Sequence, residues 1–245
     1  MTNSFVIIVP ARSGSTRLPN KPLAMINGRS VISRIIDLAN SSNASNVYIA
    51  TDSDEIKDHC ESHGANVVMT SSNHTSGMDR VAEAAKILDL PPEIPILNLQ
   101  GDEPFMPLQI INQLPLMLST DTPISTACIK FSDEMDFSNP HEVKVVRSLS
   151  KKAMYFSRSI IPNSFTAEYK NYLKHLGIYA YTNETLQTLC KLKPAANEEL
   201  EKLEQLRFLD NGFNIFVEDF ECEAPISIDT PEDLEAAIIF AKKND

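Results

Sequence analysis

The sequence predicts an α/β protein built on a doubly wound, mostly parallel sheet, with a mixed or antiparallel β lobe inserted into it. In the first half, short runs of β-branched residues alternate with helical patterns. The first of these runs, residues 5–9, is apolar throughout, which is typical of a strand covered by helices on both faces of a parallel sheet. After about residue 123 this alternation ends, and strand patterns follow one another directly.

The first half is expected to form one sheet in which each strand is followed by a helix. The expected elements, in order, are the strand at 5–9, helix 30–39, strand 46–52, helix 54–63, strand 65–70, helix 78–88 and strand 94–100. The helices carry apolar residues three and four positions apart, and Gly64 suits the C-cap of the second. Right-handed crossovers bring the carboxyl ends of the strands to one edge, where ligands bind in such sheets. The polar segments 10–23, 71–80 and 101–104 lie at that edge.

The second half predicts the inserted lobe, at about residues 123–220, within a single domain that spans residues 1–245. The expected strands are 123–131, 141–149, 154–157, 177–181 and 213–219, and the expected helices are 198–209 and 231–241. In the strand at 123–131, residues 125, 127 and 129 alternate with residues 124, 126 and 128, so the two sets face opposite sides of the sheet. This alternation favours antiparallel pairing. We expect the last helix to return to the first half.

The composition limits the kinds of partner. A net charge of −11 over 245 residues repels nucleic acid and anionic membrane surfaces, so an anionic ligand needs a local basic cluster or a metal. The four cysteines form no CxxC pair, which predicts reduced thiols. No signal-peptide pattern and no apolar run of membrane-spanning length occurs. We therefore expect a cytoplasmic protein that neither binds nucleic acid nor inserts into a membrane.

A basic loop follows the first strand, in the segment "PARSGSTRLPNKPL", residues 10–23. It carries Arg12, Arg17 and Lys21 around Gly14. Backbone amides near a glycine can cradle phosphate oxygens, and the cations supply charge-assisted hydrogen bonds. Taken alone, the stretch is equally well explained as a solvated surface loop. The chain has no GxxxxGK[ST] motif and no GxGxxG after its first strand, which excludes a P-loop and gives no support to a dinucleotide-binding dehydrogenase.

Two acidic residues are candidates for a shared magnesium site. Asp102, in "LNLQGDEPF", follows a predicted strand, and Mg²⁺ typically takes one or two protein carboxylates together with phosphate oxygens. A local turn would explain Asp102 equally well. In "SIDTPEDLEAA", the start of a helix explains Thr230 and Pro231, but it does not explain Asp229.

A third candidate is the helix start in "TSGMDR", residues 75–80. The amides of Ser76 and Gly77 would point toward a ligand at the helix N-terminus. Asp79 suits the helix dipole there, whereas Arg80 does not and is a candidate to face a ligand. An ordinary capped helix accounts for this stretch when it is taken alone.

Seven motifs in the same order span almost the whole chain: PARSGSTRLPNKPL, TSGMDR, NLQGDEP, YFSR, KHLGIYAY, LEKLEQLR and IDTPEDLE. With these motifs the chain resembles the CMP-Kdo synthetase family, the 3-deoxy-manno-octulosonate cytidylyltransferases of Gram-negative bacteria. The resemblance implies a Rossmann-like nucleotidyltransferase fold. It also implies an enzyme, a cytidylyltransferase, that uses Mg²⁺ to form CMP-Kdo and pyrophosphate from CTP and the acidic sugar Kdo. A homodimer built through the inserted lobe, and a product used in lipopolysaccharide or capsule synthesis, are further implications.

The resemblance also assigns roles to individual residues. It implies that Lys21, Arg17, Asp102 and Asp229 are catalytic, and that Asp102 and Asp229 bind the metal. The residues implied to bind CTP are Pro10, Ala11, Arg12, Ser13, Gly14, Ser15, Lys21, Ser76, Gly77, Arg80 and Gln100. Those implied to bind the sugar are Arg158, His175, Tyr179, Glu204 and Gln205. Without the resemblance, a lone histidine such as His175 is more often structural.

The chain departs from the family pattern at three places. Asn20 replaces a usual glycine, and asparagine tolerates the left-handed backbone such a turn needs. Met78 replaces a usual threonine, and the aromatic residue and cation that commonly follow Pro162 are missing. Two other functions therefore stay open: a cytidylyltransferase for a related acidic sugar, such as 8-amino-Kdo or a nonulosonate, and a catalytically silent nucleotide-binding regulatory protein.

Overall fold

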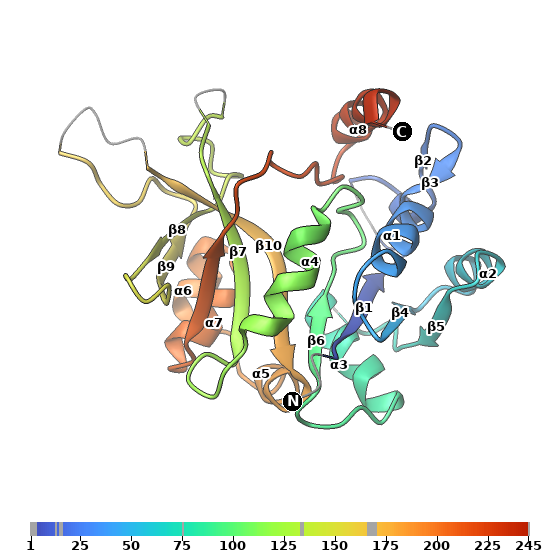
Figure 1. The fold of residues 1–245 in the computed structure, drawn as a ribbon, viewed down its shortest axis with the longest axis horizontal. Helices are drawn as coiled ribbons and strands as arrows, with labels where there is room; N and C mark the ends of the chain where they lie inside the picture. Colours follow the sequence, from blue (N-terminus) through green and yellow to red (C-terminus); the bar gives the residue numbers. More distant parts are fainter. Residues whose placement is uncertain are drawn as a thin grey trace.

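A nine-stranded sheet forms the centre of the computed structural model, with helices on both faces (Figure 1). The structure describes residues 4–12, 14, 17–74, 76–132, 135–165 and 171–244. The predicted site residues Ser13 and Ser15 lie outside these ranges. The main path of the sheet runs in the order β11-β7-β10-β6-β1-β4-β5, and β8 and β9 extend from β10.

The parallel half of the sheet follows the predicted alternation. Its strands are β1 (Val6–Ala11), β4 (Asn46–Thr51), β5 (Asn66–Met69) and β6 (Pro95–Asn98), and they pair with one another in parallel. The connecting helices are α1 (Val31–Asn40), α2 (Asp54–Ser62) and α3 (Gly77–Ile87). Ile35 of α1 packs with Ile7 on one face of β1, whereas Val81 of α3 packs with Ile8 on the other. Because helices cover both faces, the prediction of a doubly wound sheet is confirmed.

The second half contributes the antiparallel part of the same sheet. Its strands are β7 (Ile124–Lys130), β8 (Lys144–Arg147), β9 (Ala153–Ser157), β10 (Leu173–Thr182) and β11 (Ile215–Asp219). Strand β10 lies between β6 and β7 and is antiparallel to both, while β11 is parallel to β7. The predicted mixed pairing is therefore confirmed, and the strands of the lobe continue the central sheet. The register of β10 on β6 pairs Tyr179 with Asn98, which brings residues of the lobe to the carboxyl end of a parallel strand.

One predicted helix is in fact two. Residues 198–209 were expected to form a single helix, but α6 (Ala196–Glu201) ends at Lys202, and α7 (Gln205–Asp210) begins three residues later. Lys202 has a left-handed φ of 53°, which a continuous α-helix excludes. Glu204 takes the N-cap position of α7 after the resulting turn, and Gln205 begins the helix; both are candidate sugar-binding residues.

Several short elements carry no strong pattern and were not predicted. They are the 3₁₀ helices η1 (Lys21–Leu23) and η2 (Leu114–Met117), the hairpin of β2 (Met25–Ile26) and β3 (Arg29–Ser30), and the helices α4 (Leu108–Gln113) and α5 (Asn183–Leu189). Each is seven residues or shorter, so tertiary contacts outweigh local propensity in deciding its structure.

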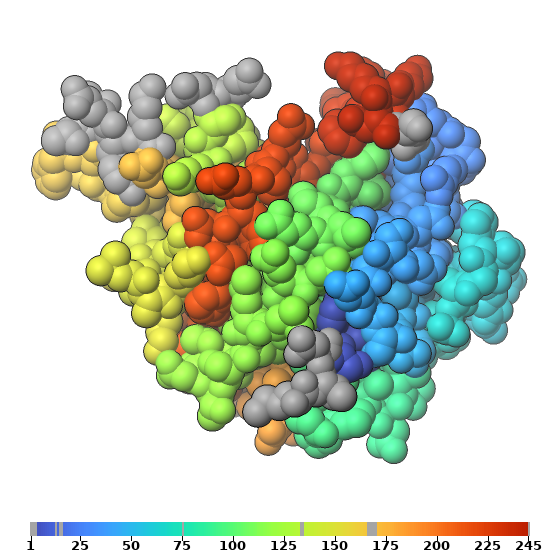
Figure 2. Space-filling view, viewed as in Figure 1, coloured from blue at the N-terminus to red at the C-terminus, as the bar shows by residue number. Residues whose placement is uncertain are grey.

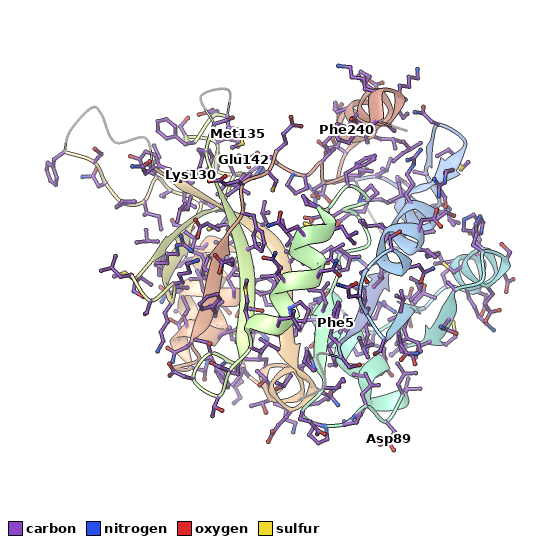
Figure 3. The ribbon with its side chains drawn as sticks, viewed as in Figure 1. Phe5, Asp89, Lys130, Met135, Glu142 and Phe240 are labelled. Atoms are coloured by element: carbon purple, nitrogen blue, oxygen red, sulfur yellow. The ribbon has the colours of Figure 1, made fainter. Side chains whose placement is uncertain are left out.

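The C-terminal helix α8 (Pro231–Asn244) returns to the first half, as predicted. In the space-filling view it lies against the N-terminal part of the chain (Figure 2). Its Ala237 and Ala241 share a core with Ile26, and the ring of Phe240, labelled in Figure 3, packs edge-on against Phe105 at 4.9 Å. Among the described residues, each helix is too short or too polar to span a bilayer.

Candidate active site

A polar cavity of about 540 Å³ opens at the carboxyl ends of β1 and β6. Every described residue that was predicted to bind the nucleotide or the metal lines it: Pro10, Ala11, Arg12, Gly14, Arg17, Lys21, Ser76, Gly77, Arg80, Gln100, Asp102 and Asp229. These residues come from four segments that are distant in the sequence. The fold therefore brings the predicted set together in one place, and the individual roles stay predictions.

Lys21 lies between the two candidate metal ligands. Its Nζ is 2.7 Å from Oδ2 of Asp102 and 3.1 Å from Oδ1 of Asp229. Arg17 contacts the second carboxylate as well, with its Nη2 3.0 Å from Oδ2 of Asp229. Two acidic side chains thus converge close enough to share one cation.

Local structure explains how each of these three side chains is presented. Asn20 adopts φ 52°, as expected for its left-handed turn, and directly precedes the 3₁₀ helix that begins with Lys21. The backbone N–H of Ile228 donates to the carbonyl of Asp102 at 2.9 Å, so the two acidic segments are tied together beside their carboxylates. Asp233 accepts from the amides of Asp229 and Thr230. Because Asp233 caps α8, the Asp229 side chain is left for the cavity.

The donor set fits a hard divalent cation bound together with a ligand. No group of three or more His, Cys, Asp or Glu side chains suited to a metal occurs among the described residues. Asp102 and Asp229 would supply two oxygens, and Mg²⁺ commonly completes its octahedron with water and phosphate oxygens. A site of this kind holds its metal tightly only when an anionic ligand is also present.

Close packing at the strand ends requires glycine at position 101 and leaves little room for a side chain at position 77. A Cβ atom on Gly101 would lie 2.5 Å from the carbonyl oxygen of Pro10, which is much closer than such atoms approach. A Cβ atom on Gly77 would lie 3.3 Å from Cγ of Pro10 and 3.4 Å from Oε1 of Gln100. The missing side chains let the turn after β6 and the start of α3 close around the end of β1.

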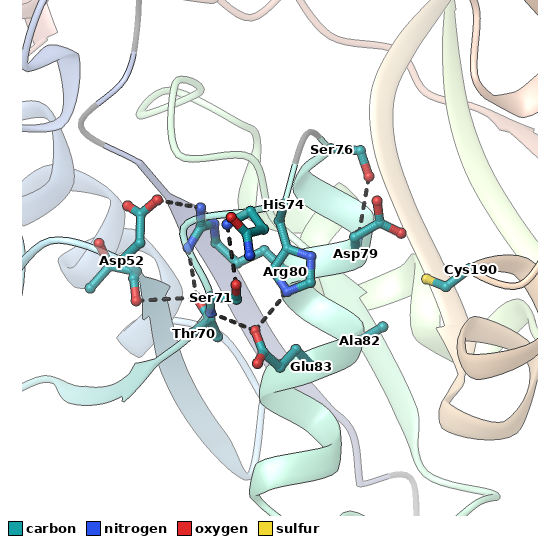
Figure 4. Close-up of polar contacts among 12 residues, drawn as sticks. Asp52, Thr70, Ser71, His74, Ser76, Asp79, Arg80, Ala82, Glu83 and Cys190 are labelled. Atoms are coloured by element: carbon teal, nitrogen blue, oxygen red, sulfur yellow. Dashed lines mark hydrogen bonds and ion pairs between the residues drawn. The ribbon is translucent and has the colours of Figure 1, made fainter.

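Arg80 is buried although it lines the cavity. Its side chain is 2% exposed. It donates from Nη2 to Oδ2 of Asp52 at 2.8 Å and from Nη1 to Oγ1 of Thr70 at 2.6 Å, as Figure 4 shows. Neither Asp52 nor Thr70 was predicted as a site residue. The one available signal was that Asp52 is the acidic residue at the end of the predicted strand 46–52.

A second cavity of about 200 Å³ adjoins the first. Gly77 and Gln100 line both cavities, and the predicted sugar-binding residues Tyr179, Glu204 and Gln205 line the second. The Tyr179 hydroxyl is buried and has no hydrogen-bond partner among the described residues. Burial also raises the pKa of Glu204. The second cavity therefore offers polar groups that a ligand rich in hydroxyls can satisfy.

Asn98 and Glu103 were not among the predicted site residues either. Asn98 accepts a hydrogen bond from Nε2 of Gln100 at 3.1 Å and lines the second cavity. This bond uses the amide nitrogen of Gln100 and leaves its oxygen beside Gly77. Glu103 lies behind Asp102, and burial, with a smaller effect of Asp102, raises the pKa of Glu103 to about 8.

Two predicted sugar-binding residues are not among the described residues that line either cavity. The guanidinium of Arg158 donates to the backbone carbonyls of Pro140 (3.0 Å), Glu201 (2.7 Å) and Lys202 (3.3 Å). His175 is 8% exposed, and its Nε2 lies 3.0 Å from Oγ1 of Thr126. Both side chains support the walls of the lobe in this structure, and their contact with a sugar stays a prediction from the resemblance.

Comparisons with known proteins show the family and the fold of the chain. The model of the family described as cytidylyltransferase matches residues 6–234. The 3-deoxy-manno-octulosonate cytidylyltransferase of Polynucleobacter necessarius is 44% identical over 236 residues, which cover 94% of this chain and 93% of the relative. The protein of the same name from Marinobacter nauticus is 41% identical and is covered to 94%. A solved structure of a CMP:2-keto-3-deoxy-manno-octonic acid synthetase complexed with CTP matches with a TM-score of 0.92 and 34% identity, over 99% of both chains.

The buried imidazole of His175 is expected to make stability depend on pH. Burial lowers the pKa of His175 from 6.5 to about 3. Above pH 6.5 the group is neutral in both states, and as the pH falls from 6.5 toward 3 only the unfolded chain binds the proton. The free energy of unfolding should therefore decrease by up to about 1.4 kcal/mol per pH unit from this group.

We predict that His175→Asn flattens the pH dependence of stability between about pH 4 and 6.5, because in the wild type the unfolded chain alone binds a proton at His175 in that range. Urea denaturation at a series of pH values measures the slope. The same substitution at the exposed His141 controls for the loss of a histidine. Identical slopes in the wild type and His175→Asn would contradict the prediction.

Proposed function

Because the chain belongs to the cytidylyltransferase family, we propose that it transfers CMP from CTP to the anomeric hydroxyl of 3-deoxy-D-manno-octulosonate (Kdo), with release of pyrophosphate. Relatives with more than 40% identity over nearly the full chain carry the corresponding name. A matching solved structure is described as complexed with CTP. The observation that carries the proposal is the convergence of Lys21, Asp102 and Asp229 in one cavity.

In the proposed reaction the sugar hydroxyl attacks the α-phosphorus of CTP in line with the departing pyrophosphate. A bond forms between the hydroxyl oxygen and phosphorus, the bond from phosphorus to the bridging oxygen breaks so that pyrophosphate leaves with the electron pair, and the hydroxyl proton passes to solvent water. Positioning and charge neutralisation are expected to supply most of the rate, as in other phosphoryl-type transfers. Arg12, Arg17 and Lys21 would bind the triphosphate, because their charged N–H groups can donate hydrogen bonds to phosphate oxygens.

Asp102 and Asp229 would hold the divalent cation, which we expect to be Mg²⁺. When bound, such a cation neutralises phosphate charge and lowers the pKa of a coordinated hydroxyl. The two aspartates supply the oxygens and Lys21 offsets their mutual repulsion. Glu103 lies next to Asp102 in the sequence, and burial raises the pKa of its carboxyl.

The second cavity is the proposed site of the hydroxyl-bearing part of the acidic sugar. No Lys or Arg is among the described residues that line it, so the sugar carboxylate would lie toward the cations and the metal site of the first cavity. Tyr179, Glu204 and Gln205 supply polar groups there, and the shared wall at Gln100 would bring the sugar hydroxyl next to the nucleotide. Kdo is the expected substrate, and 8-amino-Kdo or a nonulosonate is the alternative. Cytoplasmic location and use of the product in lipopolysaccharide or capsule synthesis stay predictions from the sequence.

The metal-binding role predicts a large loss of turnover in Asp102→Asn and Asp229→Asn. Each substitution keeps the shape but removes one charged ligand, so pyrophosphate release with CTP, Mg²⁺ and Kdo should fall by at least about two orders of magnitude. Glu232→Gln, on the exposed start of α8, is the matched control. Near-normal turnover in either aspartate variant would remove that residue from the proposed metal site.

Lys21→Ala should lower the maximal rate more than it weakens CTP binding, because the contact of Lys21 with the phosphate strengthens as charge builds in the transition state.

A comparison of sugars tests the proposed acceptor. We expect CMP transfer to Kdo to be faster than transfer to 8-amino-Kdo or N-acetylneuraminate, because the motifs that line the second cavity are those of the Kdo enzymes. Formation of the CMP-sugar is followed directly by chromatography. Preference for either of the other sugars would reassign the substrate, and absence of transfer to any acidic sugar would favour the silent regulatory protein.

We also infer a homodimer formed through the inserted lobe. Leu149, in the connection between β8 and β9, and Met154, in β9, are 107% and 64% exposed, and exposed apolar surface commonly marks interfaces. Light scattering of the wild type should give the mass of two chains, and the double variant Leu149→Asp, Met154→Asp should give one. Ile87→Asp, on an exposed position of α3, should leave the mass unchanged. A monomeric wild type would refute the inference.

A further inference from the structure

Asp52 and Thr70 hold Arg80 at the wall of the nucleotide cavity, and the two residues have no role in the reaction described above. Arg80 belongs to the first turns of α3, whereas Asp52 follows β4 and Thr70 follows β5. The two bonds to the guanidinium, 2.8 Å to Asp52 and 2.6 Å to Thr70, come from neighbouring strands (Figure 4). We infer that Asp52 and Thr70 are positioning residues that fix the Arg80 guanidinium at the base-binding end of the cavity and thereby help to select the nucleotide base. This inference rests on the proposed function, because it takes the ligand to be a nucleotide.

The hydrogen bonds set the direction of the Thr70 hydroxyl. Its Oγ1 donates to the carbonyl of Thr51 at 3.1 Å, and a hydroxyl has only one hydrogen to donate. It must therefore accept from Arg80. The backbone N–H of Thr70 binds the same Thr51 carbonyl at 2.8 Å, so the acceptor is held by two bonds to β4. A guanidinium that meets such an acceptor has little freedom to rotate.

The Asp52 carboxylate compensates the buried positive charge of Arg80. Arginine stays charged in proteins, and a buried cation near a helix N-terminus is unfavourable because the helix dipole is positive there. The Asp52 carboxylate offsets that charge in a pair whose side chains are 2% and 14% exposed. At one end of the cavity, Arg80 and Asp52 form a pair without net charge. At the loop end, three cations (Arg12, Arg17 and Lys21) outnumber the two carboxylates of the cavity wall.

This charge pattern matches a nucleoside triphosphate lying in one direction. The triphosphate is favoured at the loop end, which has the net positive charge, and the uncharged base is favoured at the Arg80 end. The bonds to Asp52 and Thr70 use two of the five N–H groups of Arg80, and a fixed planar fork presents the others in defined directions. Cytosine has adjacent acceptors at O2 and N3, whereas uracil has a hydrogen on N3. A fixed guanidinium therefore favours cytosine.

A purely structural role is the competing explanation. In that case the pair would anchor α3 to the sheet and would affect every ligand of the cavity alike. The two roles differ in what they predict for a ligand without a base. Inorganic tripolyphosphate occupies only the loop end, so its affinity reports on the structure of the cavity and not on base recognition.

The test compares Thr70→Val, Thr70→Ser and Asp52→Asn in the full-length chain. Isothermal titration in Mg²⁺ measures the affinities for CTP and tripolyphosphate, and steady-state assays measure kcat/KM for CTP and UTP. Glu83→Gln is the matched control: it lies one turn along α3 and binds His74 and the amide of Ser71, without a hydrogen bond to Arg80. Thermal denaturation reports whether each variant is folded.

We expect Thr70→Val to weaken CTP binding about tenfold, since it removes one charge-assisted hydrogen bond. It should lower the preference for CTP over UTP and leave tripolyphosphate binding unchanged. Thr70→Ser, which keeps the hydroxyl, should restore both properties. Asp52→Asn should act in the same direction as Thr70→Val, and Glu83→Gln should not change them.

Equal weakening of CTP and tripolyphosphate by Thr70→Val would overturn the inference, as would unchanged CTP binding and base preference in that variant. If Asp52→Asn does not fold, the two Thr70 variants decide alone. Failure of the proposed function is seen separately, because the wild type would then form no CMP-sugar.

Discussion

The candidate site depends on the meeting of Lys21 with two aspartates that are 81 and 208 residues away in the sequence. Two carboxylates that point at one another repel unless a cation lies between them. The lysine provides that cation, and the backbone bond from Ile228 to Asp102 holds the two acidic segments side by side. The course of the chain after β11 follows from this constraint, because α8 must begin next to the turn after β6.

The sheet topology then determines how two substrates can meet. The parallel half supplies the basic loop, the glycine at the start of α3 and the turn at Gly101, all at strand ends. Strand β10 pairs antiparallel with β6 and brings Tyr179 opposite Asn98. The two cavities consequently share Gly77 and Gln100. A transfer between two bound molecules needs such a shared wall, since the reacting atoms must come into contact.

Much of this arrangement could be predicted from the sequence because the signals were local or were carried by ordered motifs. The strand–helix alternation located the parallel strands, and the edge rule for such sheets located the loop of Lys21 and the turn of Asp102. Asp229 was singled out because the capping residues of α8 did not need it, and Thr230 and Asp233 do cap the helix reciprocally.

Other features could not be predicted, since they arise from tertiary contacts. Lys202 ends α6 with a left-handed backbone, and nothing in the local pattern of residues 198–209 indicates it. The Asp52–Arg80–Thr70 cluster joins three elements, so no single segment carries its signature. Arg158 and His175 were assigned by resemblance alone. Arg158 binds backbone carbonyls and His175 contacts a hydroxyl in the lobe, and a sequence motif does not indicate such partners.

The central claim is that the basic loop and both aspartates form one metal–nucleotide site. Crystals grown with CTP and Mn²⁺ test it most directly, because anomalous scattering locates the manganese without reference to any role assigned in advance. The account predicts a single peak bound by the carboxylates of both Asp102 and Asp229, with Lys21 on the phosphates of the same nucleotide. Manganese bound by only one of the two aspartates, or a nucleotide outside the cavity, would contradict it.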